Sequence, residues 1–166
     1  MIFNIKSYLK FLLKSTNEHG IHSPFVFDYL TKCLYQKPQK SKDKVINVLL
    51  KSIAYFNAKS ILVKGNNSLK KELEKNFQGV PEKKPPIDVL YFESPMSQNP
   101  DNVFSSFPLH NDSLILFRGI YESRETFLHW MEFTKSEKVT VSMDLFYCGL
   151  IFIRKEQVKQ HFTIRI

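Results

Sequence analysis

Long apolar runs are missing from this sequence, and cysteine is rare. No stretch approaches the ~20 apolar residues that cross a bilayer, and the apolar residues near the start are interrupted by Lys6, Lys10 and Lys14. This is not the pattern of a secretory signal. The two cysteines, Cys33 and Cys148, are far apart and form no CxxC pair. We therefore expect two reduced thiols in the core and a cytoplasmic protein.

Glycine is also scarce, with 5 copies in 166 residues. Loops that cradle phosphates or nucleotides usually need several glycines. The sequence has no GxSxG, HExxH or GxxxxGK[ST] motif, which argues against a hydrolase elbow, a zincin and a P-loop. His19 and His22 have only Glu18 nearby as a further ligand type. We interpret this pair as part of a structural turn and expect no metal site.

What is present is the composition of one ordinary globular domain, with 43% hydrophobic and 24% charged residues. The formal net charge is +8, which attracts anionic partners. However, the lysines are scattered, and arginine, which base recognition favours, is rare beside lysine. These features favour a solvated surface over a nucleic-acid site. A basic nucleic-acid-binding protein stays open as an alternative function, although nucleic acid is not the partner we expect.

Three helices are predicted in the first third of the chain. The segment 3–15 places apolar residues near a 3.6-residue period, with the three lysines on the other side. We expect this helix to dock on its own domain or on a second subunit; a membrane surface is the alternative. A second helix over 24–35 has an N-cap in Ser23 and Pro24 at its first position. A third helix is predicted over 42–56.

Strands and helices then alternate. Strands are predicted at 60–64, 87–92 and 113–117, helices at 69–77, 101–107 and 123–135, and a closing antiparallel hairpin at 138–144 and 149–154. Ser68 and Ser123 are the predicted helix caps, and a Pro-rich loop is predicted over 79–86. The pattern predicts an α/β fold with a mostly parallel sheet. We expect an N-terminal helical segment, 1–58, packed on a sheet domain, 59–166, as a single unit.

Both ends of the chain resemble the short class I S-adenosylmethionine (SAM)-dependent methyltransferases of flavobacteria and related bacteria. The segments that carry the likeness are IKSYLKF at 5–11, HGIHSPF at 19–25, FYCGLIFIRKEQ at 146–157 and HFTIRI at 161–166. The resemblance implies a Rossmann-like methyltransferase sheet, in which an antiparallel last strand is a family trait. It also implies SAM as the cofactor of an active member.

The functional motifs of that family match less well. Its first strand runs into an acidic-x-Gly-x-x-x-Gly loop, whereas this chain has Val63 at the acidic position, retains Gly65, and has Leu69 in place of the later glycine. Leucine does not adopt a positive φ cheaply, and its side chain would fill space near the ligand. The resemblance leaves Gly65, Asn66 and Glu93 as cofactor-binding candidates, with Glu93 following the strand at 87–92. No catalytic residue is assigned.

A whole portion of the expected sheet is missing as well. The 18 residues between Ser68 and Ile87 leave room for one helix and a loop, too few for a further strand, helix and strand. The later strand ends at Arg118, where the family has acidic residues. Three functions stay open: a SAM-dependent methyltransferase-like protein with eroded cofactor binding, a non-catalytic binding or oligomerisation module with a homodimer as one form, and the nucleic-acid binder.

Overall fold

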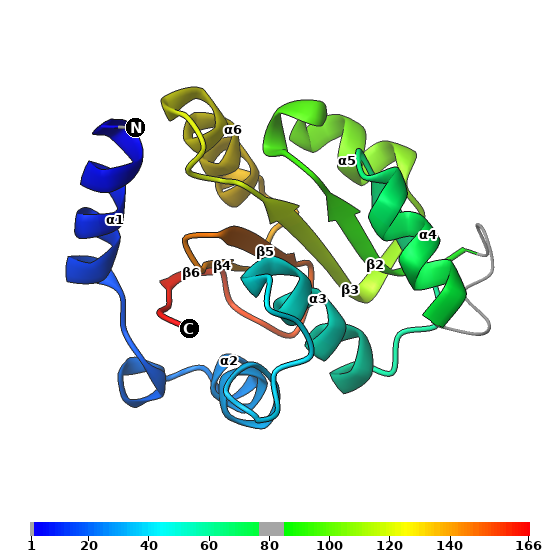
Figure 1. The fold of residues 1–166 in the computed structure, drawn as a ribbon, viewed down its shortest axis with the longest axis horizontal. Helices are drawn as coiled ribbons and strands as arrows, with labels where there is room; N and C mark the ends of the chain where they lie inside the picture. Colours follow the sequence, from blue (N-terminus) through cyan, green and yellow to red (C-terminus); the bar gives the residue numbers. More distant parts are fainter. Residues whose placement is uncertain (1, 77–84) are drawn as a thin grey trace.

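In the computed structural model, which describes residues 2–76 and 85–166, the chain forms a six-stranded sheet with helices on both faces (Figure 1). The helices are α1 (Ile2–Lys14), α2 (Pro24–Tyr29), α3 (Lys44–Tyr55), α4 (Asn67–Asn76), α5 (Pro100–Ser106) and α6 (Arg124–Lys135). The strands are β1 (Ile61–Lys64), β2 (Ile87–Phe92), β3 (Leu109–Arg118), β4 (Val141–Asp144), β5 (Cys148–Phe152) and β6 (Gln160–Thr163). The end of the predicted helix at residue 77 and most of the predicted Pro-rich loop lie outside the described residues.

The strand order is β1-β2-β3-β5-β4-β6. β5 alone among these strands runs against its neighbours β3 and β4, while the β1–β2, β2–β3 and β4–β6 pairs are parallel. The predicted α/β class and the closing hairpin of β4 and β5 are therefore confirmed. β6 was not predicted, because its four residues, QHFT, have no apolar run and lie half-buried or exposed at the sheet edge. The pairing with β4, not the local sequence, makes this segment a strand.

Both faces of the sheet are buried, as a nearly continuous apolar strand requires. Val89 and Tyr91 of β2 face a core shared with α2, α3 and α4, and Leu90 and Phe92 face a second core shared with α5 and α6. All four side chains are fully buried. The helices α2 and α3 thus share one hydrophobic core with the sheet and with α4.

The two consecutive β-α-β units have opposite handedness. β1, β2 and β3 are parallel neighbours in this order, yet α4 packs on the α3 face through Leu69 and Leu73, and α5 packs on the other face through Val103. In Figure 1, α4 lies in front of the sheet with α3, the arrows of β2 and β3 point upward, and β3 lies to the left of β2. β1 is on the other side of β2, so the chain moves leftward from β1 to β2 with α4 in front. The β1-α4-β2 unit is therefore the left-handed one, a sense found in only about 2% of such crossovers.

Local capping decides where the helices begin. Ser23 accepts a hydrogen bond from the Val26 N–H, and Ser123 forms a capping box with Thr126, so both predicted caps are confirmed. The predicted cap Ser68 is wrong. Asn66 caps α4 instead, since its Oδ1 accepts the Leu69 N–H at 2.9 Å. Asp43, which was not predicted as a cap, begins α3 by accepting the N–H groups of Val45 and Ile46.

Helix α1 packs on its own domain with a narrower face than its apolar pattern suggests. Phe11 is 4% exposed and lies 5.4 Å, centroid to centroid, from Phe146. Ile5, Leu9 and Leu13, which are among the apolar residues of the predicted amphipathic segment 3–15, are exposed instead. The helix docks with the row Phe3, Ser7 and Phe11, which leaves a second apolar row on the outside.

Candidate functional site

The three predicted cofactor-binding residues meet at one edge of the sheet. The parallel strands β1, β2 and β3 end at this edge, where open α/β sheets bind their ligands. Gly65 follows β1 with φ +84°, and a Cβ on it would lie 3.0 Å from the Glu93 Cβ. The positive φ and this close approach both favour glycine. The tight passage beside Glu93 therefore explains Gly65 without any bound cofactor.

Asn66 uses both ends of its side-chain amide within the protein. Its Oδ1 caps α4, as described above, and its Nδ2 donates a hydrogen bond of 2.9 Å to Glu93 Oε2. The neighbouring Leu69, expected near the ligand, is 4% exposed and belongs to the core under α4. Two predicted cofactor ligands, Asn66 and Glu93, are thus partners of each other.

Glu93 has further partners on both of its carboxylate oxygens. The Tyr91 hydroxyl donates a hydrogen bond of 2.7 Å to Oε2, and Arg118 Nε lies 3.5 Å from Oε1. Burial, reinforced by the adjacent Glu93 carboxylate, raises the pKa of Tyr91, so that its hydroxyl keeps its proton and donates at neutral pH. The Glu93 carboxylate therefore contacts Asn66 just after β1, Tyr91 of β2 and Arg118 of β3.

Arg118 extends this cluster to the N-terminus of α3. Its guanidinium Nη2 lies 2.7 Å from Asp43 Oδ2, while Asp43 Oδ1 caps the helix. Partial burial by itself raises the pKa of Asp43, but the bond from Arg118 and those from the Ile46 and Val45 N–H groups outweigh it and lower the pKa. The bond to Asp43 in turn raises the pKa of Arg118. We call Asp43, Asn66, Tyr91, Glu93 and Arg118 the edge network.

Two members of the edge network, Asn66 and Glu93, were predicted from the sequence as site residues. Arg118 was noted only because it stands where the family has acidic residues. Asp43 and Arg118 are 75 positions apart, so no local pattern connects them. Asp43 could have been found as a helix cap, because it is the last polar residue with a side-chain acceptor before the apolar run of α3.

Two cavities lie along the same end of the sheet. The one beside Arg118 and Gly119 has a volume of about 220 Å³, below the usual range for small-molecule sites. A larger one, of about 380 Å³, lies under α1 and reaches Asp144 and Tyr121. The Asp144 carboxylate there already accepts the Tyr121 hydroxyl at 2.6 Å and the Phe146 N–H at 2.9 Å. Its acceptors are therefore used within the protein.

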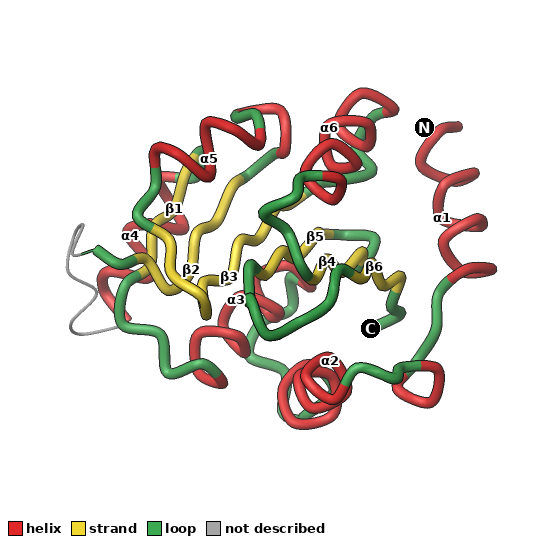
Figure 2. The backbone as a smooth tube through the Cα atoms, turned by 180° about the vertical axis from the view of Figure 1, so that it is seen from behind, coloured by secondary structure: helices red, strands yellow, loops and turns green. Residues whose placement is uncertain are grey.

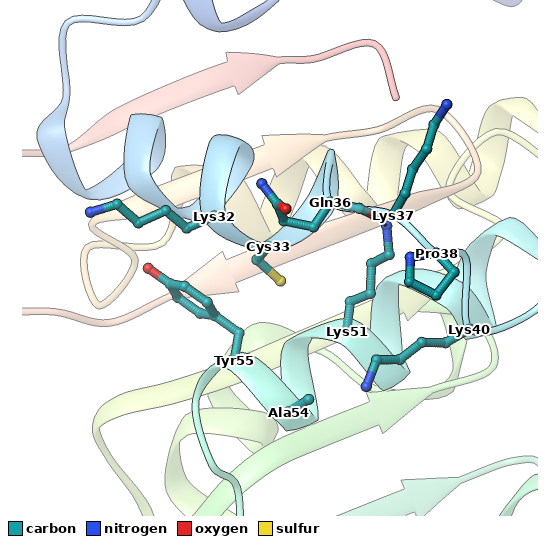
Figure 3. Close-up of a pocket in the computed structure, with 9 residues that line it drawn as sticks. All are labelled: Lys32, Cys33, Gln36, Lys37, Pro38, Lys40, Lys51, Ala54 and Tyr55. Atoms are coloured by element: carbon teal, nitrogen blue, oxygen red, sulfur yellow. Dashed lines mark hydrogen bonds between the residues drawn. The ribbon is translucent and has the colours of Figure 1, made fainter.

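A third cavity, of about 310 Å³, lies between α3 and the segment that follows α2 (Figure 3). Four of its nine lining residues are lysines and none is acidic, which suggests an anion site at first sight. Lys51, however, is 6% exposed, and its Nζ donates to the main-chain carbonyls of Leu34 and Gln36. Lys32 pairs with Asp28 at 2.8 Å, and Figure 3 shows Lys32 and Lys37 reaching outward in different directions.

The chemistry of Lys51 is that of a helix C-terminal cap, since a cation satisfies the carbonyls left free where the π-helical segment Leu30–Leu34 ends. The thiol of Cys33 lines the same cavity. Burial raises the pKa of Cys33 to about 12, in spite of Lys51 and Lys40 nearby. The thiol is therefore protonated at neutral pH and is not an activated nucleophile.

Within residues 2–76 and 85–166, no three His, Cys, Asp or Glu side chains gather in a way that could hold a metal ion. The Nε2 atom of His19, an exposed residue, lies 3.6 Å from Glu18 Oε1. Searches with this chain find no matching protein-family model, no matching curated protein and no matching solved structure.

Proposed function

We propose that this chain is a methyltransferase-like α/β protein that does not bind SAM and works as a non-catalytic binding module. The observation that carries the proposal is the state of Glu93. Glu93 is the acidic residue that the resemblance leaves as a cofactor ligand. Its two carboxylate oxygens are already in contact with Asn66, Tyr91 and Arg118. A ribose or methionine group that binds this carboxylate competes with a cation and two hydrogen-bond donors that are already in place. Displacing any of these partners costs free energy unless the ligand replaces the lost bond.

The topology supports the same proposal. In a doubly wound sheet the first strand lies centrally, with strands on both sides. Here β1 is the last strand of the sheet on its side, within the described residues. Helix α4 lies on the face that gives a left-handed unit with β2. A helix that once led to strands beyond β1 would lie on that face, so removal of those strands accounts for the rare handedness. The missing strands would have carried the adenosine half of a SAM site.

An active SAM-dependent methyltransferase is the second candidate. Gly65 favours it, because its positive φ and its place after β1 suit a cofactor loop. Methyl transfer also needs alignment of donor and acceptor more than it needs strong catalytic groups. The two candidates therefore differ in cofactor binding, and this is what the experiment must measure.

Calorimetric titration of the purified chain with SAM and with S-adenosylhomocysteine tests the proposal, together with thermal unfolding at millimolar ligand. A site with a Kd of about 10 µM would add about 2.7 kcal/mol of stability at a hundredfold ligand excess, or roughly 5–11 °C in Tm. We expect no heat and no shift. A micromolar Kd that is lost in Gly65→Trp, with that variant still folded, would overturn the proposal in favour of the enzyme.

A matched pair of variants examines the role of the edge network. Arg118→Met removes the cation that holds Glu93 and Asp43, and Lys155→Met removes an exposed cation elsewhere on the surface. If the network closes a site that is otherwise intact, Arg118→Met gains SAM binding and Lys155→Met does not. If the site itself is missing, as we propose, neither variant binds.

A further inference from the structure

The outer face of α1 carries large apolar side chains that nothing in the described chain covers. Ile5, Leu9 and Leu13 are 59%, 57% and 88% exposed, and their spacing of four residues puts them in one row along the helix. The opposite row, Phe3, Ser7 and Phe11, packs on the domain. In both views of the fold, α1 is the outermost element at one end of the molecule (Figures 1 and 2). The apolar row is therefore accessible along its whole length.

A row of lysines lies between this apolar row and the domain, since Lys10 and Lys14 also line the cavity under α1. Lys6, Lys10 and Lys14 each follow one member of it directly, and all three are exposed. Within the described residues, none of the three ammonium groups makes an ion pair. The helix sequence IFNIKSYLKFLLK contains no acidic residue. One flank of α1 thus combines an apolar stripe with uncompensated positive charge, on a chain whose formal net charge is +8.

We propose that α1 docks this protein on an anionic lipid surface. A helix lying in the plane of a bilayer buries its apolar row at the boundary of the acyl chains and keeps its lysines at the level of the anionic headgroups. The row Ile5, Leu9, Leu13 and the row Lys6, Lys10, Lys14 have this arrangement. No helix in the described part of the chain is long and apolar enough to cross a membrane, so the contact is peripheral.

The charges also argue against a second copy on this face. Two α1 helices packed against each other through their apolar rows would bring three lysines from each copy together, with no carboxylate of α1 to pair with them. Like charges at such an interface are unfavourable. An anionic surface compensates the same lysines. The inference does not depend on the proposed lack of SAM binding, because the apolar row faces away from the domain.

Cosedimentation with vesicles tests this proposal on the full chain. We expect binding to vesicles of phosphatidylcholine with phosphatidylserine, little binding to phosphatidylcholine alone, and a decline with added salt. Leu9→Glu with Leu13→Glu should reduce the partition coefficient at least tenfold. Replacing one of the three lysines by glutamine should reduce it roughly fivefold.

Val158→Glu is the matched control. Val158 is 73% exposed in the segment between β5 and β6, outside α1, so the same kind of change there should leave vesicle binding unaltered. Far-ultraviolet circular dichroism and Tm identify any variant that is misfolded. Two results would overturn the proposal. One is equal binding of the wild type and the Leu9/Leu13 variant. The other is light scattering that shows a dimer which the Leu9/Leu13 substitutions dissociate, because a second copy would then cover this face.

Discussion

Gly149 is the position at which the structure predicts the sharpest effect of a single methyl group. It lies in β5 between Phe117 and Asp144 in the register of the sheet, with its α-carbon under the ring of Trp130 from α6. A Cβ at Gly149 would lie 2.5, 2.6 and 2.8 Å from three carbons of the benzo ring. Ordinary carbon–carbon contacts are at about 3.5–4.0 Å, so the ring would have to retreat by about 1 Å.

The ring has little room for such a movement. Trp130 is fully buried, its ring centroid lies 6.2 Å from that of Phe117, and Phe133 packs in the same core. Overpacking of a filled core costs typically 1–3 kcal/mol. Alanine loses less backbone entropy than glycine on folding, which offsets this cost by up to about 1 kcal/mol. We expect Gly149→Ala to lose about 2 kcal/mol of unfolding free energy, or roughly 4–8 °C in Tm.

A double-mutant cycle with Trp130→Phe isolates this clash. Phenylalanine lacks the fused ring that blocks the new methyl group, and it also lacks the indole N–H, which has no hydrogen-bond partner within the described residues. Trp130→Phe alone should cost about 1–2 kcal/mol through the lost volume. The double variant should be less destabilised than the sum of the single changes by at least 1 kcal/mol in urea unfolding. Additivity within about 0.5 kcal/mol would refute the reasoning, because it would mean that the two sites do not touch.

Two further predictions concern buried ionisable groups. Burial raises the pKa of Asp144, in spite of its bonds from Tyr121 and Phe146, so the folded state holds this proton more tightly than the unfolded state. The contribution of this one group to stability therefore falls as pH rises from about 4 through its folded pKa. Asp144→Asn should therefore gain stability relative to the wild type between pH 4 and pH 8 in urea unfolding; a relative loss would contradict this. The thiols of Cys33 and Cys148 are free and buried, so neither should react with Ellman's reagent at pH 8 until urea is added. Stoichiometric labelling of the native protein would show that one of them is accessible.

Most secondary structure of this chain could be predicted from local patterns. The alternation of strands and helices, the caps Ser23 and Ser123, and the closing hairpin depend on residues within a few positions of one another. Local patterns failed where two candidates compete. Asn66 and Ser68 are both capping residue types near the start of α4, but the helix already begins at Asn67, and the backbone turn at Gly65 places Asn66 at the cap position.

Part of the candidate site could also be predicted from the positions of residues relative to the strands. Gly65, Asn66 and Glu93 follow two buried strands, and parallel strands bring their ends together, so their proximity follows from the topology. The charged partners of Glu93 could not be predicted in this way. Arg118 reaches Glu93 and Asp43 across three elements, and no spacing in the sequence indicates that these charges satisfy one another.

The sequence by itself determined the α/β class and the order of the elements, since helical and strand periodicity are properties of short segments. Only the tertiary structure decided which side of α1 is buried, because apolar residues occupy more of its circumference than one docking face can cover. It also decided the face on which α4 lies, the pairing that makes β6 a strand, and the pairing of Glu93 with Asn66 and Arg118. Each of these depends on contacts between residues far apart in the chain, whose free energy is gained only once the sheet has assembled.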